Sequence, residues 1–130
     1  MICLDTTFII DFLNNVDGAL KKAEEFKDKI VVTTAINEFE TIVGCYLKNL
    51  SQESINKTVS FFNCIRILNF DTNSALKSAE IVYNLRRMGE TINNDDCLAA
   101  GIAVSNGCQT IITMNKKHLE KIKGIKVETY

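Results

Sequence analysis

Carboxylates occupy three places in the chain where a polar residue ends or borders an apolar run. Asp5 ends the stretch ICLD, Glu40 lies within TTAINEFETIVGCYL, and Asp95 and Asp96 precede CLAAG. Asn115 follows the apolar stretch TIIT. Ionised carboxylates that are gathered together repel one another unless a cation compensates them, and Mg²⁺ and Mn²⁺ favour oxygen ligands. A cation bound in this way can activate water for attack on a phosphodiester.

Each of these polar residues also has an ordinary structural explanation. Asp5 stands before a predicted helix and could cap it by accepting a backbone hydrogen bond. Asn and Asp residues at the start of the helix predicted at 94–106 could cap it and complement its dipole. Capping explains one acid there more easily than two, so Asp96 is the stronger site candidate and Asp95 the fallback. Asn115 could be a turn or cap residue.

The helix predicted at 34–49 carries two glutamates, and their angular positions separate them. At about 100° per residue from Ile36, an apolar stripe falls between about −80° and +20°. The stripe contains Phe39, Val43, Tyr46, Leu47 and Leu50. Glu40 falls at about +40°, at the edge of the stripe, and Glu38 falls at about 200°. We expect Glu40 to border the inward face and Glu38 to be solvated; Glu40 as an amphipathic boundary residue remains the alternative.

Short apolar runs alternate with longer amphipathic segments, and this alternation predicts the elements that position these residues. Strands are expected at 2–5, 30–33, 65–68, 109–113 and 125–129. Helices are expected at 6–14, 16–28, 34–49, 52–63, 72–88, 94–106 and 115–122. The pattern predicts an α/β fold with a mostly parallel sheet flanked by helices on both faces. Such sheets bind ligands outside the carboxyl ends of their strands.

Length and composition are those of an ordinary globular protein. The 130 residues suit one domain, which we expect to span 1–130. No apolar run is long enough to span a bilayer and no export signal is evident, so we expect no membrane association and a cytoplasmic location. The net charge of −1 argues against binding nucleic acid by bulk positive charge. Five cysteines without a C-x-x-C pair are expected to be buried, reduced thiols.

Four segments, in the expected order, resemble the PIN domain and in particular the VapC-type toxin ribonucleases of toxin–antitoxin pairs. They are DTTFIIDFL, NEFETIVG, FDTNSALKSAEIVYNLRRMGETINNDDCLAAGIA and TIITMNKKHLEKI. Each segment alone is weakly specific, but the ordered set covers essentially the whole chain. The resemblance implies a PIN-like twisted parallel sheet with acids at one edge. It also implies a metal-dependent endoribonuclease that hydrolyses RNA phosphodiester bonds.

The resemblance assigns roles to individual residues. The first acid of the family maps to Asp5, its helix glutamate to Glu40 and its later aspartate to Asp96, with Asp95 as the fallback. These residues would be catalytic and would hold Mg²⁺ or Mn²⁺. Family members often carry a fourth acid after the TIIT-like strand, whereas this chain has Asn115, which removes one negative charge from the expected metal site. The resemblance further implies an RNA substrate, a cognate antitoxin protein and a homodimer.

Two other functions are compatible with the sequence. A catalytically weak RNA-binding or RNA-processing PIN domain would keep the fold, and Asn115 favours it. A phosphoryl-transfer enzyme or receiver domain could also place Asp5 at a strand end. The haloacid-dehalogenase-like version, however, expects a second Asp where this chain has Thr7. His118 is the only histidine, which excludes a histidine pair of the ribonuclease A kind, and we interpret it as a helix surface residue.

Basic residues close to these motifs could flank a phosphate path. They are Arg86, Arg87, Lys116, Lys117, Lys121 and Lys123. Solvated helix faces explain the same residues equally well. The absence of Trp and the scarcity of other aromatic residues give little support to a base-stacking platform.

Overall fold

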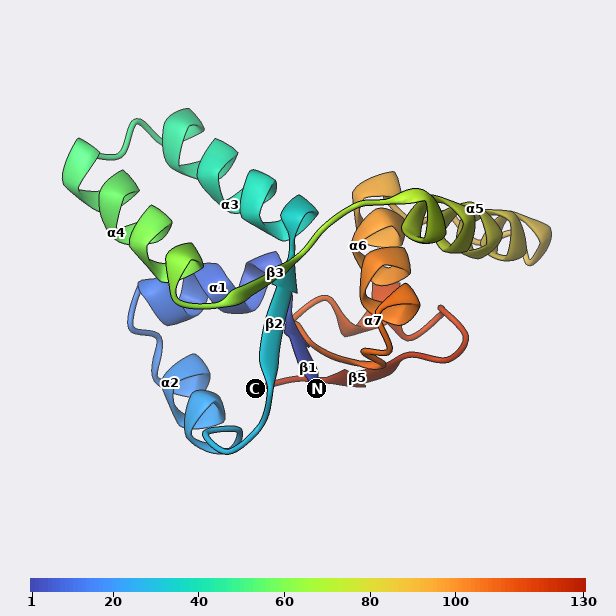
Figure 1. Ribbon diagram of the computed structural model, residues 1–130, viewed down its shortest axis with the longest axis horizontal. Coiled ribbons are helices and arrows are strands. Elements are labelled where there is room, and N and C mark those ends of the chain that lie inside the picture. The colour runs from blue at the N-terminus through green and yellow to red at the C-terminus, as the bar shows by residue number, and fades with distance from the viewer.

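The computed structural model describes residues 1–130 and places one five-stranded sheet between two layers of helices (Figure 1). The strands are β1 (Ile2–Leu4), β2 (Val31–Thr34), β3 (Arg66–Leu68), β4 (Thr110–Ile112) and β5 (Lys126–Glu128). The helices are α1 (Thr6–Leu13), α2 (Asp17–Glu24), α3 (Ala35–Leu47), α4 (Gln52–Asn63), α5 (Thr72–Arg87), α6 (Asn94–Ser105) and α7 (Lys116–Leu119). The predicted α/β class is confirmed, and every strand pair is parallel.

The strand order is β3-β2-β1-β4-β5, so the first strand of the chain lies in the centre of the sheet. Leu4, the last residue of β1, is in register with Ile112, the last residue of β4. Because parallel strands all point the same way, Asp5 and Thr113 leave the sheet side by side at its carboxyl edge. This edge is where the sequence predicts the ligand site.

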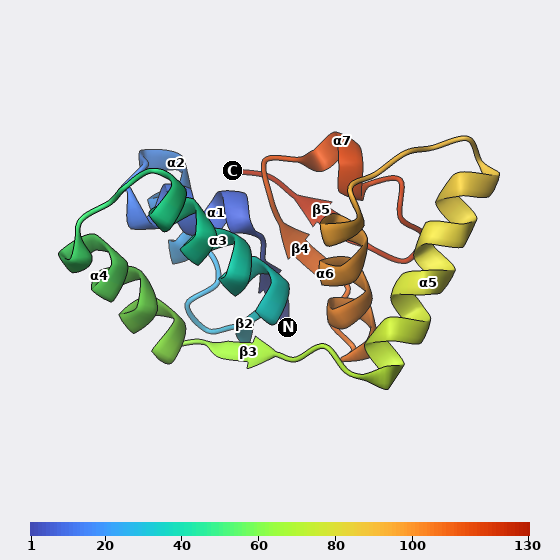
Figure 2. The same ribbon diagram turned by 90° about the horizontal axis from the view of Figure 1, so that it is seen from above.

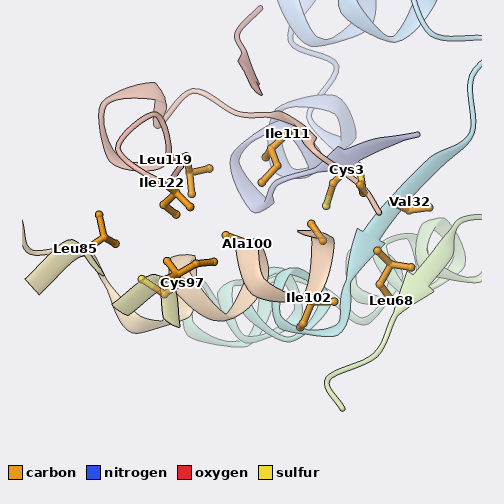
Figure 3. Packing of buried hydrophobic residues seen from close by; sticks show 13 residues of the cluster. Cys3, Val32, Leu68, Leu85, Cys97, Ala100, Ile102, Ile111, Leu119 and Ile122 are labelled. Carbon is orange, nitrogen blue, oxygen red and sulfur yellow. The ribbon is translucent and has the colours of Figure 1, made fainter. Parts of the chain in front are cut away.

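Successive residues of the central strands supply two hydrophobic cores, one on each face of the sheet. Cys3 and Ile111 pack with α5, α6 and α7 on one face (Figure 3). Ile2 and Leu4 pack with α1, α2 and α4 on the other. Figure 2 shows α5 and α6 as a pair set apart from α1, α3 and α4. This alternation along buried parallel strands explains their short, continuously apolar runs.

Two helices, α2 and α7, are shorter than the sequence predicts by four residues or more. The helix expected at 16–28 ends at Glu24, because the following turn directs Phe26 into the core, where its ring lies 5.7 Å from that of Phe8. The helix expected at 115–122 ends at Leu119. The chain then turns through Gly124, whose φ of 85° lies in the left-handed region that favours glycine.

The cysteines are all free thiols, and four of them are buried as expected. The expectation is wrong for Cys64, which is exposed at the carboxyl end of α4. No helix combines the length and the apolar character that crossing a bilayer requires.

The apolar stripe of α3 was expected to face inward, and that prediction is wrong. Phe39 and Leu47 are 59% and 78% exposed, and Tyr46 and Leu50 are exposed as well. The buried side of α3 consists of Asn37, Thr41 and Cys45. These side chains are small enough for close packing, and each forms a hydrogen bond with a neighbouring buried group. Hydrophobic periodicity therefore identifies a surface stripe of α3 instead of its core face.

Helices α5 and α6 pack closely because Gly101 has no side chain. A Cβ atom at this position would lie 2.0 Å from the Ser78 hydroxyl oxygen and 2.8 Å from the Ser78 backbone nitrogen. Both residues are buried. The small residues predicted in α6 are thus used for helix packing.

We predict that Gly101→Ala lowers the free energy of unfolding by about 1–3 kcal/mol, because the backbone of α5 would have to move to make room for the added methyl group. Gly44→Ala is the matched control, since a Cβ atom at that helical position meets no atom within 4 Å. It should raise the free energy of unfolding by roughly 0.5–1 kcal/mol through helix propensity. Urea denaturation measures both changes. Equal unfolding midpoints for the two variants would contradict the packing argument.

Candidate active site

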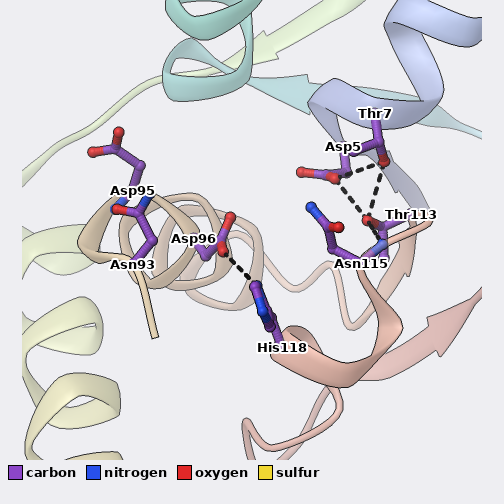
Figure 4. A network of polar contacts seen from close by, with 8 residues as sticks. All are labelled: Asp5, Thr7, Asn93, Asp95, Asp96, Thr113, Asn115 and His118. Carbon is purple, nitrogen blue, oxygen red and sulfur yellow. Dashed lines mark hydrogen bonds and ion pairs between the residues drawn. The ribbon is translucent and has the colours of Figure 1, made fainter. Parts of the chain in front are cut away.

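Two threonine hydroxyls hold the buried carboxylate of Asp5 at the end of β1 (Figure 4). Thr7 Oγ1 donates to Asp5 Oδ2 over 3.0 Å, and Thr113 Oγ1 donates to the same oxygen over 2.7 Å. The Thr7 hydroxyl accepts a hydrogen bond from the backbone N–H of Met114, and the Thr113 hydroxyl accepts one from that of Asn115. These contacts orient the carboxylate and leave Oδ1 without a protein donor.

Capping does not explain the two aspartate motifs. Asp5 occupies the N-cap position of α1, but its side chain makes no cap hydrogen bond. Asn93 caps α6 by accepting a hydrogen bond from the Asp95 backbone N–H over 3.1 Å. Neither the Asp5 nor the Asp96 carboxylate is therefore used as a helix cap.

Glu40 reaches the same edge of the sheet from α3. Thr6 Oγ1 donates to Glu40 Oε2 over 2.6 Å, so consecutive threonines after Asp5 bind two different carboxylates. Burial raises the pKa of Glu40, the hydrogen bond from Thr6 partly opposes this shift, and nearby negative charges add to it. Those charges belong to Asp5, Asp95 and Asp96. The structure thus brings together the three acids that the sequence places far apart.

Asp96 shares a small pocket with Asp5. Burial raises the pKa of Asp96, the charge of Asp5 raises it further, and His118 lowers it. Nδ1 of His118 lies 3.6 Å from Asp96 Oδ2. The His118 side chain is 57% exposed, as expected for a surface residue, but its contact with a site carboxylate was not expected.

The two remaining candidates differ in position. Figure 4 shows Asp95 apart from the hydrogen-bonded network around Asp5, on the other side of Asp96. Asp95 adds negative charge to the site, as the pKa shifts of Glu40 and Asp96 indicate. Asn115 starts α7 without making a cap hydrogen bond, and Figure 4 shows its amide beside Asp5. Its amide oxygen is available as a neutral ligand.

Several polar residues that support the site were not identified from the sequence. Thr33 Oγ1 and Asn37 Nδ2 both donate to the carbonyl oxygen of Leu4, over 2.7 and 2.8 Å. Thr34 Oγ1 donates to Asn37 Oδ1 over 3.0 Å. These buried contacts fix the first turn of α3, and hence Glu40, against the end of β1. The sequence feature that could have identified these residues is the run of hydroxyl and amide side chains in TTAIN, directly after an apolar strand.

The donor set fits a hard divalent cation. No three His, Cys, Asp or Glu side chains form a compact metal cluster. Mg²⁺ is, however, commonly held by one or two protein carboxylates, with water and substrate phosphate completing its ligands. Asp5 and Asp96 line one pocket, and the backbone N–H of Asn115 binds Thr113, the residue that binds Asp5. The raised pKa values of Glu40 and Asp96 mark a place where a cation would relieve unfavourable negative charge.

The parallel sheet with acids at its carboxyl edge is the arrangement that the resemblance to the PIN domain implies. The chain matches the PIN domain over residues 2–125 and belongs to that family. It is 24% identical over 127 residues to "tRNA(fMet)-specific endonuclease VapC" of Salmonella typhimurium, an alignment that covers 98% of this chain and 96% of the relative.

Solved structures share the fold at low sequence identity. VapBC2 from Rickettsia felis, bound to a DNA fragment from its promoter, aligns with a TM-score of 0.89 and 22% identity, covering 100% of this chain and 99% of the other. VapC20 of Mycobacterium tuberculosis, described as a sarcin–ricin loop cleaving toxin, aligns with a TM-score of 0.67 and 16% identity. That alignment covers 85% of this chain and 87% of the other. The predicted PIN-like fold is confirmed.

We predict that Glu40→Gln stabilises the metal-free protein at neutral pH, and that this advantage disappears on acidification. A raised pKa means that folding disfavours the charged form, so the stability contributed by the neutral form is present at low pH and lost as pH rises through the folded-state pKa. Glutamine imitates the neutral form and can still accept the hydrogen bond from Thr6. Thermal unfolding in a chelator across the acid-to-neutral range measures the difference.

Glu38→Gln is the matched control, because it makes the same change of residue type on the same helix without removing the carboxylate that binds Thr6. Added Mg²⁺ or Mn²⁺ should stabilise the wild type at neutral pH more than Glu40→Gln. If the difference in thermal stability between wild type and Glu40→Gln widens on acidification, the assigned direction of the Glu40 pKa shift is wrong.

Proposed function

We propose that the protein is a divalent-metal-dependent endoribonuclease that acts in the cytoplasm as the toxin of a toxin–antitoxin pair. The observation that carries the proposal is the convergence of Asp5, Glu40 and Asp96 at one edge of the sheet, with the pKa of both Glu40 and Asp96 raised. Endonuclease activity in the relative of Salmonella typhimurium and RNA cleavage in VapC20 support it.

In this proposal, Asp5, Glu40 and Asp96 hold Mg²⁺ or Mn²⁺, and Asn115 contributes a neutral oxygen. The cation would supply an activated water and compensate negative charge on the phosphodiester. The protein supplies orientation through three hydroxyls, since Thr7 and Thr113 fix Asp5 and Thr6 fixes Glu40.

A second proposal is an RNA-binding PIN domain with weak catalysis. Asn115 favours it, because an amide replaces the fourth acid that is common in the family and attracts a cation less strongly. Both proposals retain RNA as the ligand. They differ in whether cleavage occurs at any concentration of divalent metal.

We predict that Asp5→Asn, Asp96→Asn and Glu40→Gln each reduce metal-dependent RNA cleavage by about a hundredfold or more, since each removes a charge that attracts the cation. Glu38→Gln should cleave like the wild type. Cleavage of bulk tRNA with Mg²⁺, Mn²⁺ or chelator measures these rates. Wild-type rates in a site variant would remove that residue from the site. No cleavage by the wild type with either metal would favour the RNA-binding proposal.

We further propose two protein partners, a cognate antitoxin and a second copy of the chain. VapBC complexes among the structural relatives support the antitoxin. Its extended or helical tail would cover the acidic edge and present Arg or Lys where the metal and RNA bind. The exposed apolar stripe of α3 supports the homodimer, because large apolar side chains that are exposed together on one surface commonly form interfaces.

We predict that the purified protein has twice the mass of one chain, and that Leu47→Glu converts it to a monomer by placing a charge in the apolar stripe. Light scattering coupled to size-exclusion chromatography measures the mass. Ile30→Glu is the matched control, because Ile30 is 62% exposed and precedes β2 at the opposite edge of the sheet. It should leave the dimer intact. A monomeric wild type would rule out this homodimer.

A further inference from the structure

A second charged feature lies outside the acidic edge, in a cleft between α5 and the segment that follows α7. The cleft has a volume of about 700 Å³. Four basic side chains line it, together with one acid, Glu80, and an apolar floor that includes Ile81, Leu85 and Ile122. The basic residues are Lys77, Arg87, Lys121 and Lys123. They come from two parts of the chain that are more than thirty positions apart.

Two of these four cations have no carboxylate partner. Lys77 pairs with Glu80 over 3.2 Å, and Lys121 pairs with Glu90 over 2.6 Å. Lys123 forms no ion pair, and the Arg87 guanidinium lies over the Tyr83 ring, 5.7 Å from its centroid. Exposed ion pairs of this kind contribute little stability, so these lysines can exchange their carboxylate partner for another anion. The cleft therefore carries an excess of positive charge in a protein whose net charge is −1.

Short segments connect the cleft to the acidic edge. Residues 88–93 lead from the end of α5 to the start of α6, which carries Asp95 and Asp96. On the other side, α7 follows Asn115 and ends at Leu119, two residues before Lys121. Figure 2 shows α7 near the start of α6. Lys116 and Lys117 on α7 are exposed. These two lysines add positive charge between Asn115 and the cleft residue Lys121.

We propose that this cleft binds the phosphate backbone of the RNA outside the position of cleavage. The inference rests on the proposed function for the identity of the ligand. The acids at the site repel RNA, so a polyanion needs positive charge elsewhere on the surface to remain bound. Arg87, Lys121 and Lys123 are exposed and Lys77 is half-buried, and the four cations are spread over two segments without a fully buried donor that would select one small anion. This distribution suits successive phosphates of a polymer.

The test compares RNA binding by Lys123→Glu with binding by Lys57→Glu. Lys57 is an exposed lysine on α4, away from the cleft, and serves as the matched control. Fluorescence anisotropy in a chelator, with labelled bulk tRNA, measures affinity across a salt series. Lys123→Glu should bind tRNA roughly tenfold more weakly and reduce the salt slope by about one, because a phosphate contact is lost.

Lys123→Arg should bind tRNA like the wild type, because the charge is retained. Equal tRNA affinities and salt slopes for Lys123→Glu and Lys57→Glu would overturn the proposal. Cleavage with Mg²⁺ or Mn²⁺ is scored separately. If the wild type binds tRNA through Lys123 but does not cleave it, the proposed nuclease activity is refuted and RNA binding by the cleft is supported. If the wild type cleaves tRNA and Lys123→Glu binds it with unchanged affinity, only RNA binding by the cleft is refuted.

Discussion

The hydrogen bond from Thr113 to Asp5 is 2.7 Å long and joins residues that are 108 positions apart. It connects the ends of the neighbouring strands β1 and β4 at the edge where the acids gather. The Thr7 hydroxyl binds the same carboxylate oxygen and is itself held by the Met114 backbone. The orientation of Asp5 therefore depends on correct pairing of the central strands.

Gathering acids at this edge is unfavourable, and the surrounding polar contacts limit the cost. Burial and mutual repulsion raise the pKa of Glu40 and Asp96, while hydrogen bonding to Thr6 and the nearby His118 oppose those shifts. Thr33 and Asn37 bind the Leu4 carbonyl, so α3 cannot shift away from β1 without leaving buried polar groups unpaired. The site is held in an electrostatically unfavourable arrangement that a cation would relieve.

The sequence predicts the sheet and its helices because short apolar runs separated by amphipathic segments allow few other arrangements. It also predicts that Asp5 and Asn115 leave strands at one edge. It does not reveal the contact between His118 and Asp96, which depends on how α7 packs against α6. The α3 stripe is misassigned for a related reason: periodicity measures how apolar a face is, and a surface available for a partner has the same pattern as a core face. The polar contacts of Asn37 and Thr41 decide which side is buried.

The central place of β1 in the sheet affects when this protein can become active during its own synthesis. β1 leaves the ribosome before its neighbour β4, and the hydroxyl of Thr113 follows Asp5 by 108 positions. An unfinished chain can neither complete the sheet nor orient Asp5. Contacts between such distant segments also form slowly. A nascent chain that lacks β4 therefore carries no assembled acidic site, which delays any activity of that site until the segment with Thr113 has been made.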